Sequence, residues 1–415
     1  MPSSDAASAS NAVIDRGAPS SLLLTPITLR GVTARNRIVV SPMCQYASVE
    51  GGPTDWQLVH FGRYAMGGAG IVFGEETAVE ARGRKTYHCA GIWNAHQVKA
   101  YRRVTDFIRE MGAVPAIQIG HCGRNAGSHG AMQEWRPLDE RDARAGQPPW
   151  RGLAPSPIPA RRGFPVPIEM DHDDIKTVLQ AFGDATHRAV DAGYDICEIH
   201  GAHGYLIHQF LSPVSNHRTD GYGGGRAARM RFALEVAETV RAAWPVDKPL
   251  FFRVSAVDGK GGLWGIDDTV ELARELGRRD VDLVDCSSGG ISGDSPMPLV
   301  PRVPGYQVPY ASRVRREAGV MSMAVGLITE PHQAEAVLRE GHADLVAMAR
   351  ELMVHADWPL RAAKALTDDP FGLMTPSIAH RLRRREEQAV AYPPGSAVEI
   401  PLMADRTETY RWPQP

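Results

Sequence analysis

Eight short runs rich in apolar and β-branched residues recur along the chain, and most are separated by segments with helical periodicity. The runs are residues 37–43, 69–79, 113–121, 194–200, 249–255, 281–288, 320–328 and 343–350. The helical pattern is clearest over residues 97–112, 175–193 and 267–280. Strands that alternate with helices imply a parallel sheet, and eight such units match a (β/α)8 barrel better than an open sheet. We therefore predict an α/β fold, a TIM barrel in a single domain.

Three further segments complete the predicted organisation of the 415 residues. Residues 1–22 are rich in Ser and Ala, contain Asp and lack a continuous apolar stretch, which predicts a flexible tail rather than a signal peptide. The barrel is expected over 23–366, with a Pro- and Arg-rich loop at 123–167 that is long enough to serve as a lid over a pocket. Residues 367–415 lose the periodicity and form a C-terminal extension.

Charge and cysteine usage exclude several classes of protein. A formal net charge of -2 does not favour nucleic-acid or membrane-surface binding, which needs a basic excess. No apolar run reaches the length of about 18 residues that a membrane span requires. The five cysteines are odd in number and contain no CxxC pair, so neither a disulfide framework nor a zinc or iron-sulfur site is expected. These features predict a cytoplasmic protein with a small-molecule ligand.

Polar side chains follow nearly every predicted strand, and the most informative group follows the fourth. His200, His203 and Tyr205 come directly after the run 194–200. Because TIM barrels place their chemistry at the C-terminal ends of the strands, these rings are expected to face a shared pocket. Two histidines can hold a carbonyl or phenolate oxygen, and a tyrosine beside them can donate a proton. A metal site and a pair of satisfied core histidines remain alternatives.

Other strand ends indicate an anionic, ring-shaped ligand. The loops after strands seven and eight of such barrels frequently bind phosphate, and here they carry Gly326 and Arg350. Arg253 follows an apolar run and would be a buried cation unless an anion pairs with it. Gln118 offers both a donor and an acceptor. A flavin, whose ring has imide edges and becomes anionic on reduction, would satisfy these groups.

Six motifs also resemble those of a known family. They are NRIVVSPMCQYAS at 36–48, TDWQLVHFGRYAMGGAG at 54–70, IQIGHCGR at 117–124, HGAHGYLIHQFLSPVSNHRTDGYGG at 200–224, RVSAVD at 253–258 and AVGLIT at 324–329. The chain resembles the old yellow enzyme family of FMN-dependent ene-reductases, and more closely the bacterial subgroup with a cysteine after Ser-Pro-Met. The resemblance spans about residues 25–365.

The resemblance assigns a role to each site residue. It implies FMN held around the ring and at the phosphate by Pro42, Met43, Cys44, Glu76, Gln118, Arg253, Gly326, Ala349 and Arg350. It also implies that Cys44 tunes the flavin, that His200 and His203 bind the carbonyl oxygen of a substrate, and that Tyr205 delivers a proton. Tyr46 would line the substrate pocket. A homo-oligomer, a dimer or a tetramer, is expected on the same ground.

The chain departs from the family pattern at several positions. Glu76 stands where similar proteins carry a small residue, and a carboxylate there would oppose negative charge on a reduced flavin. Cys122 and Asn125 replace other residues of the third strand's motif, and Ala349 replaces a glycine before Arg350. The arginine that subgroup members lend to a neighbouring subunit has only Arg411 as a candidate.

The expected activity is transfer of hydride from NADPH or NADH to FMN, and then to the β-carbon of an α,β-unsaturated carbonyl compound. Three alternatives stay open. One is a biosynthetic flavoenzyme of the same family that catalyses desaturation or isomerisation, which Glu76 and the long loop motivate. The others are a flavin redox sensor that uses Cys44, and a metal-dependent hydrolase that uses His200 and His203.

Overall fold

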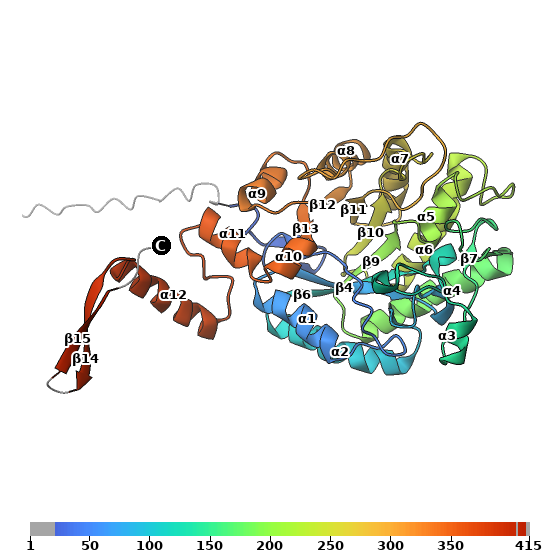
Figure 1. The fold of residues 1–415 in the computed structure, drawn as a ribbon. Helices are drawn as coiled ribbons and strands as arrows, with labels where there is room; N and C mark the ends of the chain where they lie inside the picture. The colour runs from blue at the N-terminus through green and yellow to red at the C-terminus, as the bar shows by residue number, and fades with distance from the viewer. Residues whose placement is uncertain (1–20, 404–405, 412–415) are drawn as a thin grey trace, which may run out of the picture.

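A closed barrel of parallel strands forms the centre of the computed structural model, which describes residues 21–403 and 406–411 (Figure 1). The strands in chain order are β3 (Ile38–Val40), β4 (Ile71–Ala78), β6 (Val114–Gly120), β9 (Ile196–Gly201), β10 (Leu250–Ser255), β11 (Leu283–Ser287), β12 (Met321–Val325) and β13 (Leu345–Met348). Each strand pairs in parallel with the next, and β13 pairs with β3 to close the ring. The predicted TIM barrel is confirmed, with one barrel strand in each of the eight runs; β9 extends one residue beyond its run.

Helices follow the barrel strands and cover the outside of the ring (Figure 1). They are α1 (Asp55–Met66), α2 (Ala95–Glu110), α4 (His172–Asp191), α6 (Arg226–Ala243), α7 (Ile266–Gly277), α8 (Val308–Ala318), α9 (Pro331–Arg339) and α11 (Trp358–Leu366). Two shorter helices, α5 (Leu206–Leu211) and α10 (Arg350–Val354), begin just beyond strand ends. The three helices expected from periodicity correspond to α2, α4 and α7.

The inside of the barrel is apolar at one end and polar at the other. Inward-facing residues such as Phe73 and Phe251, whose ring centroids are 6.2 Å apart, form the apolar end. A hairpin of β1 (Ile27–Leu29) and β2 (Val32–Ala34) contributes Ile27, Leu29 and Ala34 to the same cluster. Because this end is filled by packed side chains, a ligand can enter the barrel only at the C-terminal ends of the strands.

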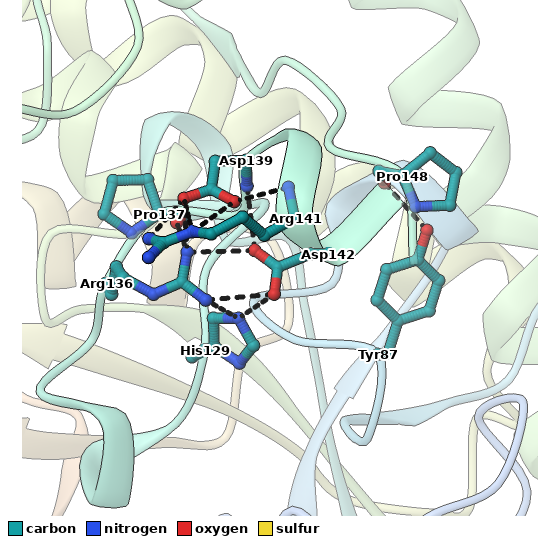
Figure 2. Close-up of polar contacts among 8 residues, drawn as sticks. All are labelled: Tyr87, His129, Arg136, Pro137, Asp139, Arg141, Asp142 and Pro148. Atoms are coloured by element: carbon teal, nitrogen blue, oxygen red, sulfur yellow. Dashed lines mark hydrogen bonds and ion pairs between the residues drawn. The ribbon is translucent and has the colours of Figure 1, made fainter. Parts of the chain in front are cut away.

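The long loop after β6 carries short elements of its own: α3 (Glu140–Arg144) and β7 (Leu153–Ala154), which pairs with β8 (Ile168–Glu169). Figure 2 shows the cluster of charged side chains that holds its middle part together. The Arg136 guanidinium donates to Asp139 at 2.8 Å and to Asp142 at 2.9 Å, and the His129 ring lies 2.9 Å from Asp142. These ion pairs hold the pKa of the Asp142 carboxyl well below its usual value.

Replacing Asp142 with asparagine is therefore expected to loosen the loop without destabilising the barrel. The amide keeps a similar shape but removes the charge that Arg136 pairs with. Limited proteolysis at neutral pH should cut within residues 123–167 faster, while the thermal unfolding midpoint stays close to that of the wild type. Asp173→Asn removes an equally charged but exposed partner of Lys176 and is the control. Equal cutting of both variants would contradict a holding role for the cluster.

The C-terminal extension contains a helix and a hairpin that no pattern in the sequence indicated. They are α12 (Pro376–Ala391), β14 (Ala397–Met403) and β15 (Arg406–Arg411), and they extend away from the barrel (Figure 1). Hydrophobic periodicity could not predict this helix. It is exposed nearly all round, and such a helix needs no apolar stripe. Of the tail predicted over 1–22, residues 1–20 lie outside the described residues.

Candidate active site

A layer of buried charged and polar groups lies above the apolar end of the barrel. Arg253 on β10 is in register with Asp285 on β11, and its Nε lies 3.1 Å from an Asp285 carboxylate oxygen. Gln118 on β6 donates to Glu198 on β9 at 2.7 Å. Burial raises the pKa of both carboxyls, and Asp285 raises that of Glu198 further. The two carboxyls share one arginine, so a state with one of them ionised is more favourable than a state with both ionised.

Arg253 is also tied to the first strand, because its Nη1 donates to the Ser41 hydroxyl at 3.1 Å. Ser41 directly precedes Pro42, Met43 and Cys44, so these three residues follow β3 at the same end of the barrel. The Arg253 guanidinium is therefore positioned from two sides, by Asp285 on β11 and by Ser41 after β3.

Two histidines and a tyrosine lie at the mouth of the barrel. His200 is on β9, in register with Arg253, and its Nε2 lies 3.4 Å from His203 Nδ1. The Tyr205 ring meets the His200 ring edge to face, with centroids 5.0 Å apart. Burial and the nearby Arg253 charge lower the pKa of both histidines well below the usual value, and burial raises the pKa of Tyr205. At neutral pH the histidines are therefore uncharged and the phenol keeps its proton.

The loop that carries these rings is held by its own hydrogen bonds. His203 has φ of 57°, a left-handed conformation, and its backbone amide donates to the Ser255 hydroxyl at 2.9 Å. Its Nε2 lies 2.6 Å from the Ser287 hydroxyl. Asn125, one of the departures from the family pattern, donates its side-chain amide to the Gly204 carbonyl at 2.7 Å. Neighbouring strands thus position the His203 ring beside His200.

A cavity of about 270 Å³ connects the ion layer with the loops after β12 and β13. Its lining includes four residues predicted to bind the cofactor, namely Arg253, Gly326, Ala349 and Arg350. Gly326 has φ of 122°, so its backbone adopts a conformation that a side chain would strain. Arg350 is exposed and forms no ion pair with any of the described residues. The cavity therefore offers a cation and a close backbone approach to an anionic group.

Tyr46 lines a second cavity, of about 500 Å³, together with residues of the long loop such as His129 and Gln133. Its φ is 54°, and its ring lies against Trp135 of that loop with centroids 5.6 Å apart. Cys44 and Tyr46 lie close enough to Tyr205 that a negative charge on either would raise the pKa of the Tyr205 phenol. The loop therefore forms a wall of the space next to the predicted catalytic rings.

Glu76 is buried near the same thiol and phenol, and one of its carboxyl oxygens has no hydrogen-bond partner among the described residues. Arg411 is the one site candidate that lies elsewhere. It ends β15 on the C-terminal hairpin, where its guanidinium donates to the Gly395 carbonyl at 3.4 Å.

Several residues of the site were not found from the sequence. Ser255 orients His203, Glu198 and Asp285 belong to the layer of buried charged groups, and Gln307 lines the cavity beside Gly326. A signal existed for the two carboxyls, because an acidic residue inside an otherwise apolar strand is rare unless it is paired. No such signal marked Gln307, which a loop and a helix bring to the cavity.

The alternatives that require other chemistry gain no support from the geometry. Among the described residues, no group of three or more His, Cys, Asp or Glu side chains is arranged to hold a metal ion. Within the same residues, no helix combines the length and apolar character needed to cross a membrane.

The buried groups without partners fit a flavin. His200 Nδ1 and a Glu198 oxygen have no hydrogen-bond partner among the residues that the structure describes. The other Glu198 oxygen is hydrogen-bonded to Gln118, and His200 is in register with Arg253 on the neighbouring strand. Buried polar atoms are rarely left unpaired, so a polar ring that binds here would satisfy groups that the protein alone does not.

Comparison with known proteins supports the same ligand. Residues 22–369 match the model of the NADH:flavin oxidoreductase / NADH oxidase family. The chain is 42% identical over 348 residues to an NADPH dehydrogenase of Geobacillus sp. strain WCH70, covering 83% of this chain and 94% of that one. It is 38% identical over 349 residues to the NADPH dehydrogenase of Bacillus subtilis, covering 84% and 96%.

Solved structures share the fold at lower identity. A morphinone reductase in complex with tetrahydroNAD superimposes with a TM-score of 0.67 at 23% identity, over 85% of this chain and 94% of that one. The old yellow enzyme homologue from Zymomonas mobilis gives a TM-score of 0.67 at 24% identity, over 86% and 97%. The fold, the family model and the relatives agree, and the chain belongs to the old yellow enzyme family of FMN-dependent NAD(P)H oxidoreductases.

Proposed function

We propose that this enzyme reduces the activated C=C bond of α,β-unsaturated carbonyl compounds with hydride from NADPH or NADH. The observation that carries the proposal is the pair of uncharged histidines, buried His200 and half-buried His203, with the Tyr205 phenol against His200. Both relatives named above are NADPH dehydrogenases, which supports NADPH as the donor.

FMN would be held by two groups of residues. The main chain around Pro42, Met43 and Cys44, with Gln118 and Arg253, would bind the ring, and Gly326, Ala349 and Arg350 would bind the phosphate. When bound, FMN accepts hydride from the nicotinamide and passes it to the alkene. The Arg253 cation would stabilise the negative charge that the reduced ring carries.

The remaining residues act on the substrate. His200 and His203 would each donate a hydrogen bond to the carbonyl oxygen and withdraw electron density from the alkene. Ser287, at 2.6 Å from His203 Nε2, would fix the orientation of that ring. Tyr205 keeps its proton and would deliver it to the α-carbon. Tyr46 would bound the pocket on the side of the long loop.

The phosphate role of Gly326 can be tested by a single methyl group. A Cβ at this position would lie 3.0 Å from the Tyr306 ring and 3.1 Å from Gln307 Nε2, at a φ that side chains rarely adopt. Gly326→Ala is expected to raise the dissociation constant of FMN by about tenfold or more, equivalent to ~1.4 kcal/mol. Titration of the apoprotein with FMN measures it by fluorescence quenching.

Gly319 supplies the control for this variant. It has φ of 70° at the end of α8, and a Cβ there would meet nothing within 4 Å. Gly319→Ala also places a Cβ at a positive φ, with smaller strain because the backbone is in the left-handed region, and should leave FMN affinity unchanged. A similar loss of affinity in both variants would show that strain alone, and not the phosphate cradle, explains the effect.

Product analysis separates the proposal from desaturation or isomerisation. With NADPH and 2-cyclohexenone under nitrogen, the enzyme should form cyclohexanone and consume one equivalent of NADPH. Formation of enone from cyclohexanone in air, or of a shifted alkene without consumption of NADPH, would instead favour the biosynthetic alternative.

The geometry does not favour a redox sensor that uses Cys44. Burial, and then the nearby Glu76 charge, raise the pKa of the Cys44 thiol well above its usual value. Redox-sensing cysteines have lowered pKa values, because the thiolate is the reactive form. Cys44 is therefore proposed to act as a neutral thiol beside the flavin.

A homo-oligomer, with Arg411 reaching a neighbouring subunit, is retained as a proposal that size measurement in solution can test.

A further inference from the structure

A bulge in β4 turns the Glu76 side chain toward the inside of the barrel. Along β6, Ala116 and Gln118 are two residues apart and share one face, but their partners on β4 are Phe73 and Glu76, three residues apart. The extra residue on β4 places Glu76 on the inward face that Phe73 occupies. Without the bulge, Glu75 would take this position. The bulge therefore directs a carboxyl toward the layer that contains Gln118.

The preceding residue, Glu75, has a structural role that Glu76 does not share. One Glu75 oxygen accepts from the Gln45 backbone amide at 2.5 Å, and the other accepts from the Gln57 side chain at 2.9 Å. Glu76 is 4% exposed, and its Oε1 has no hydrogen-bond partner among the described residues. A buried carboxyl without partners costs stability unless it serves another purpose.

Gly120 provides the space that Glu76 fills. A Cβ added at Gly120 would lie 2.5 Å from Glu76 Oε1 and 3.2 Å from the His200 Cβ. Gly120 is two residues beyond Gln118 on the same face of β6. The Glu76 carboxyl thus reaches from β4 to β6 and lies against Gly120, near the Cβ of His200.

The surroundings of Glu76 are poor in charge. Its second oxygen receives a long contact from the Cys122 thiol at 4.0 Å, and the nearby titratable groups are mostly thiols and phenols. The groups that face it from the surrounding elements are Cys44, Tyr46, Glu75, Lys85, Cys89, Tyr101, Cys122 and Tyr205. Lys85 is the cation that favours the charged form, and its ammonium lies 3.7 Å from the centre of the Trp135 ring.

Burial in these surroundings raises the pKa of Glu76 to about 8, with Lys85 opposing the shift and Glu75 adding to it. At neutral pH the side chain is therefore mainly a neutral acid. A neutral acid does not oppose negative charge on a reduced flavin, whereas the carboxylate would. A glutamate at this position is thus compatible with the cofactor while it is protonated. The charge next to the flavin then depends on pH.

We propose that the Glu76 carboxyl exchanges a proton in step with the redox state of the bound FMN, in the space that Gly120 leaves open. This inference rests on the binding of FMN at the proposed position. Reduction by NADPH transfers two electrons and one proton as hydride, and the nicotinamide is oxidised. If Glu76 is ionised before the flavin is reduced, the new negative charge on the ring raises the proton affinity of the Glu76 carboxylate. The carboxylate then takes up one further proton from the solvent.

The midpoint potential of the holoenzyme flavin, measured against pH, tests this coupling. From about pH 8 upward, the potential of the wild type should fall more steeply with pH, because each reduction binds one more proton. For a two-electron couple the extra slope is about 30 mV for each tenfold change in proton concentration. Glu76→Gln cannot take up this proton and should show no such change of slope. A single slope in the wild type across this range would overturn the proposal.

An exposed carboxylate on β8 provides the matched control. Glu169→Gln removes the same charge at the exposed surface and should keep the change of slope. Loss of the change in both variants would attribute it to net charge and contradict the proposal.

If Glu76→Gln folds poorly, infrared difference spectra of the wild type can detect protonation of the carboxyl directly. Above pH 8, the reduced-minus-oxidised spectrum should gain the carbonyl band of a protonated carboxylic acid. The absence of this band in flavin-loaded enzyme would contradict the proposal.

A double variant tests whether the Glu76 carboxyl occupies the space beside Gly120. Gly120→Ala should weaken FMN binding by displacing the carboxyl, and Gly120→Ala/Glu76→Ala should recover most of that loss. Additive effects of the two changes would contradict contact between them. Enzyme that binds FMN and shows the steeper slope, but does not reduce an enone, would refute the proposed function and leave this inference standing.

Discussion

Replacing Tyr205 with phenylalanine is expected to slow reoxidation of the reduced flavin by 2-cyclohexenone by about 10²- to 10⁴-fold. The phenol lies edge to face against His200 and keeps its proton because burial raises its pKa. The enone needs a proton at its α-carbon, whereas the flavin needs none from Tyr205 when it accepts hydride from NADPH. Anaerobic stopped-flow absorbance of the flavin should therefore show the loss in the oxidative half-reaction and a nearly unchanged reductive one.

Tyr222 offers a comparison for this variant. Its hydroxyl donates to Glu235 at 2.9 Å on the helical layer outside the barrel. Tyr222→Phe should leave both half-reactions unchanged. If Tyr205→Phe slowed both half-reactions to the same extent, its hydroxyl would have a structural role, and the assignment as proton donor would be wrong.

The largest effect on stability is expected from Arg253→Met. The guanidinium lies 3.1 Å from a fully buried Asp285, and Glu198 is buried in the same layer. Removing one partner of a buried ion pair costs about 3–5 kcal/mol, because the other charge is left without compensation. The variant should also lose FMN, since Arg253 lines the cavity proposed for the cofactor. Urea unfolding and the flavin content of the purified protein measure the two losses.

The destabilisation of Arg253→Met should depend on pH. Without the arginine, the pKa values of Asp285 and Glu198 rise further in the folded state, because burial and mutual repulsion are no longer opposed. A carboxyl with a raised pKa stabilises the folded protein below the unfolded value, and this contribution is lost as the pH rises through the folded value. The free energy of unfolding of the variant should therefore fall as the pH rises from about 4.

A second substitution separates the two roles of Arg253. In Arg253→Met/Asp285→Asn the uncompensated charge is removed, so stability should recover in part while FMN binding should not. If the double variant were no more stable than Arg253→Met, the ion pair would not be the cause of the loss.

Much of the fold and the general position of the site could be predicted because both depend on local patterns. Each barrel strand is a short apolar run, and the C-terminal end of each run is adjacent in sequence to its polar residues. His200, His203 and Tyr205 were therefore found from one segment. Gly326 and Arg350 could be proposed for the same reason, because they come one and two residues after their strands.

The parts that escaped prediction depend on contacts between distant segments. Ser255 and Ser287 orient His203 from two other strands, and the sequence gives no register between those strands and the loop. The β4 bulge likewise follows from pairing with β6, so the sequence alone could not show that Glu76, and not Glu75, faces inward. The role of Gly120 emerges only from the space that the Glu76 carboxyl occupies.

We propose that this barrel binds FMN and supports hydride transfer from NADPH to an enone. The most direct test is the absorbance spectrum of the purified protein, followed under anaerobic conditions by one equivalent of NADPH and then one of 2-cyclohexenone. We expect a flavin spectrum that bleaches with NADPH and returns with the enone. A flavin that bleaches but is not reoxidised by the enone would contradict the proposed substrate class, and a protein that binds no flavin would contradict the binding of FMN.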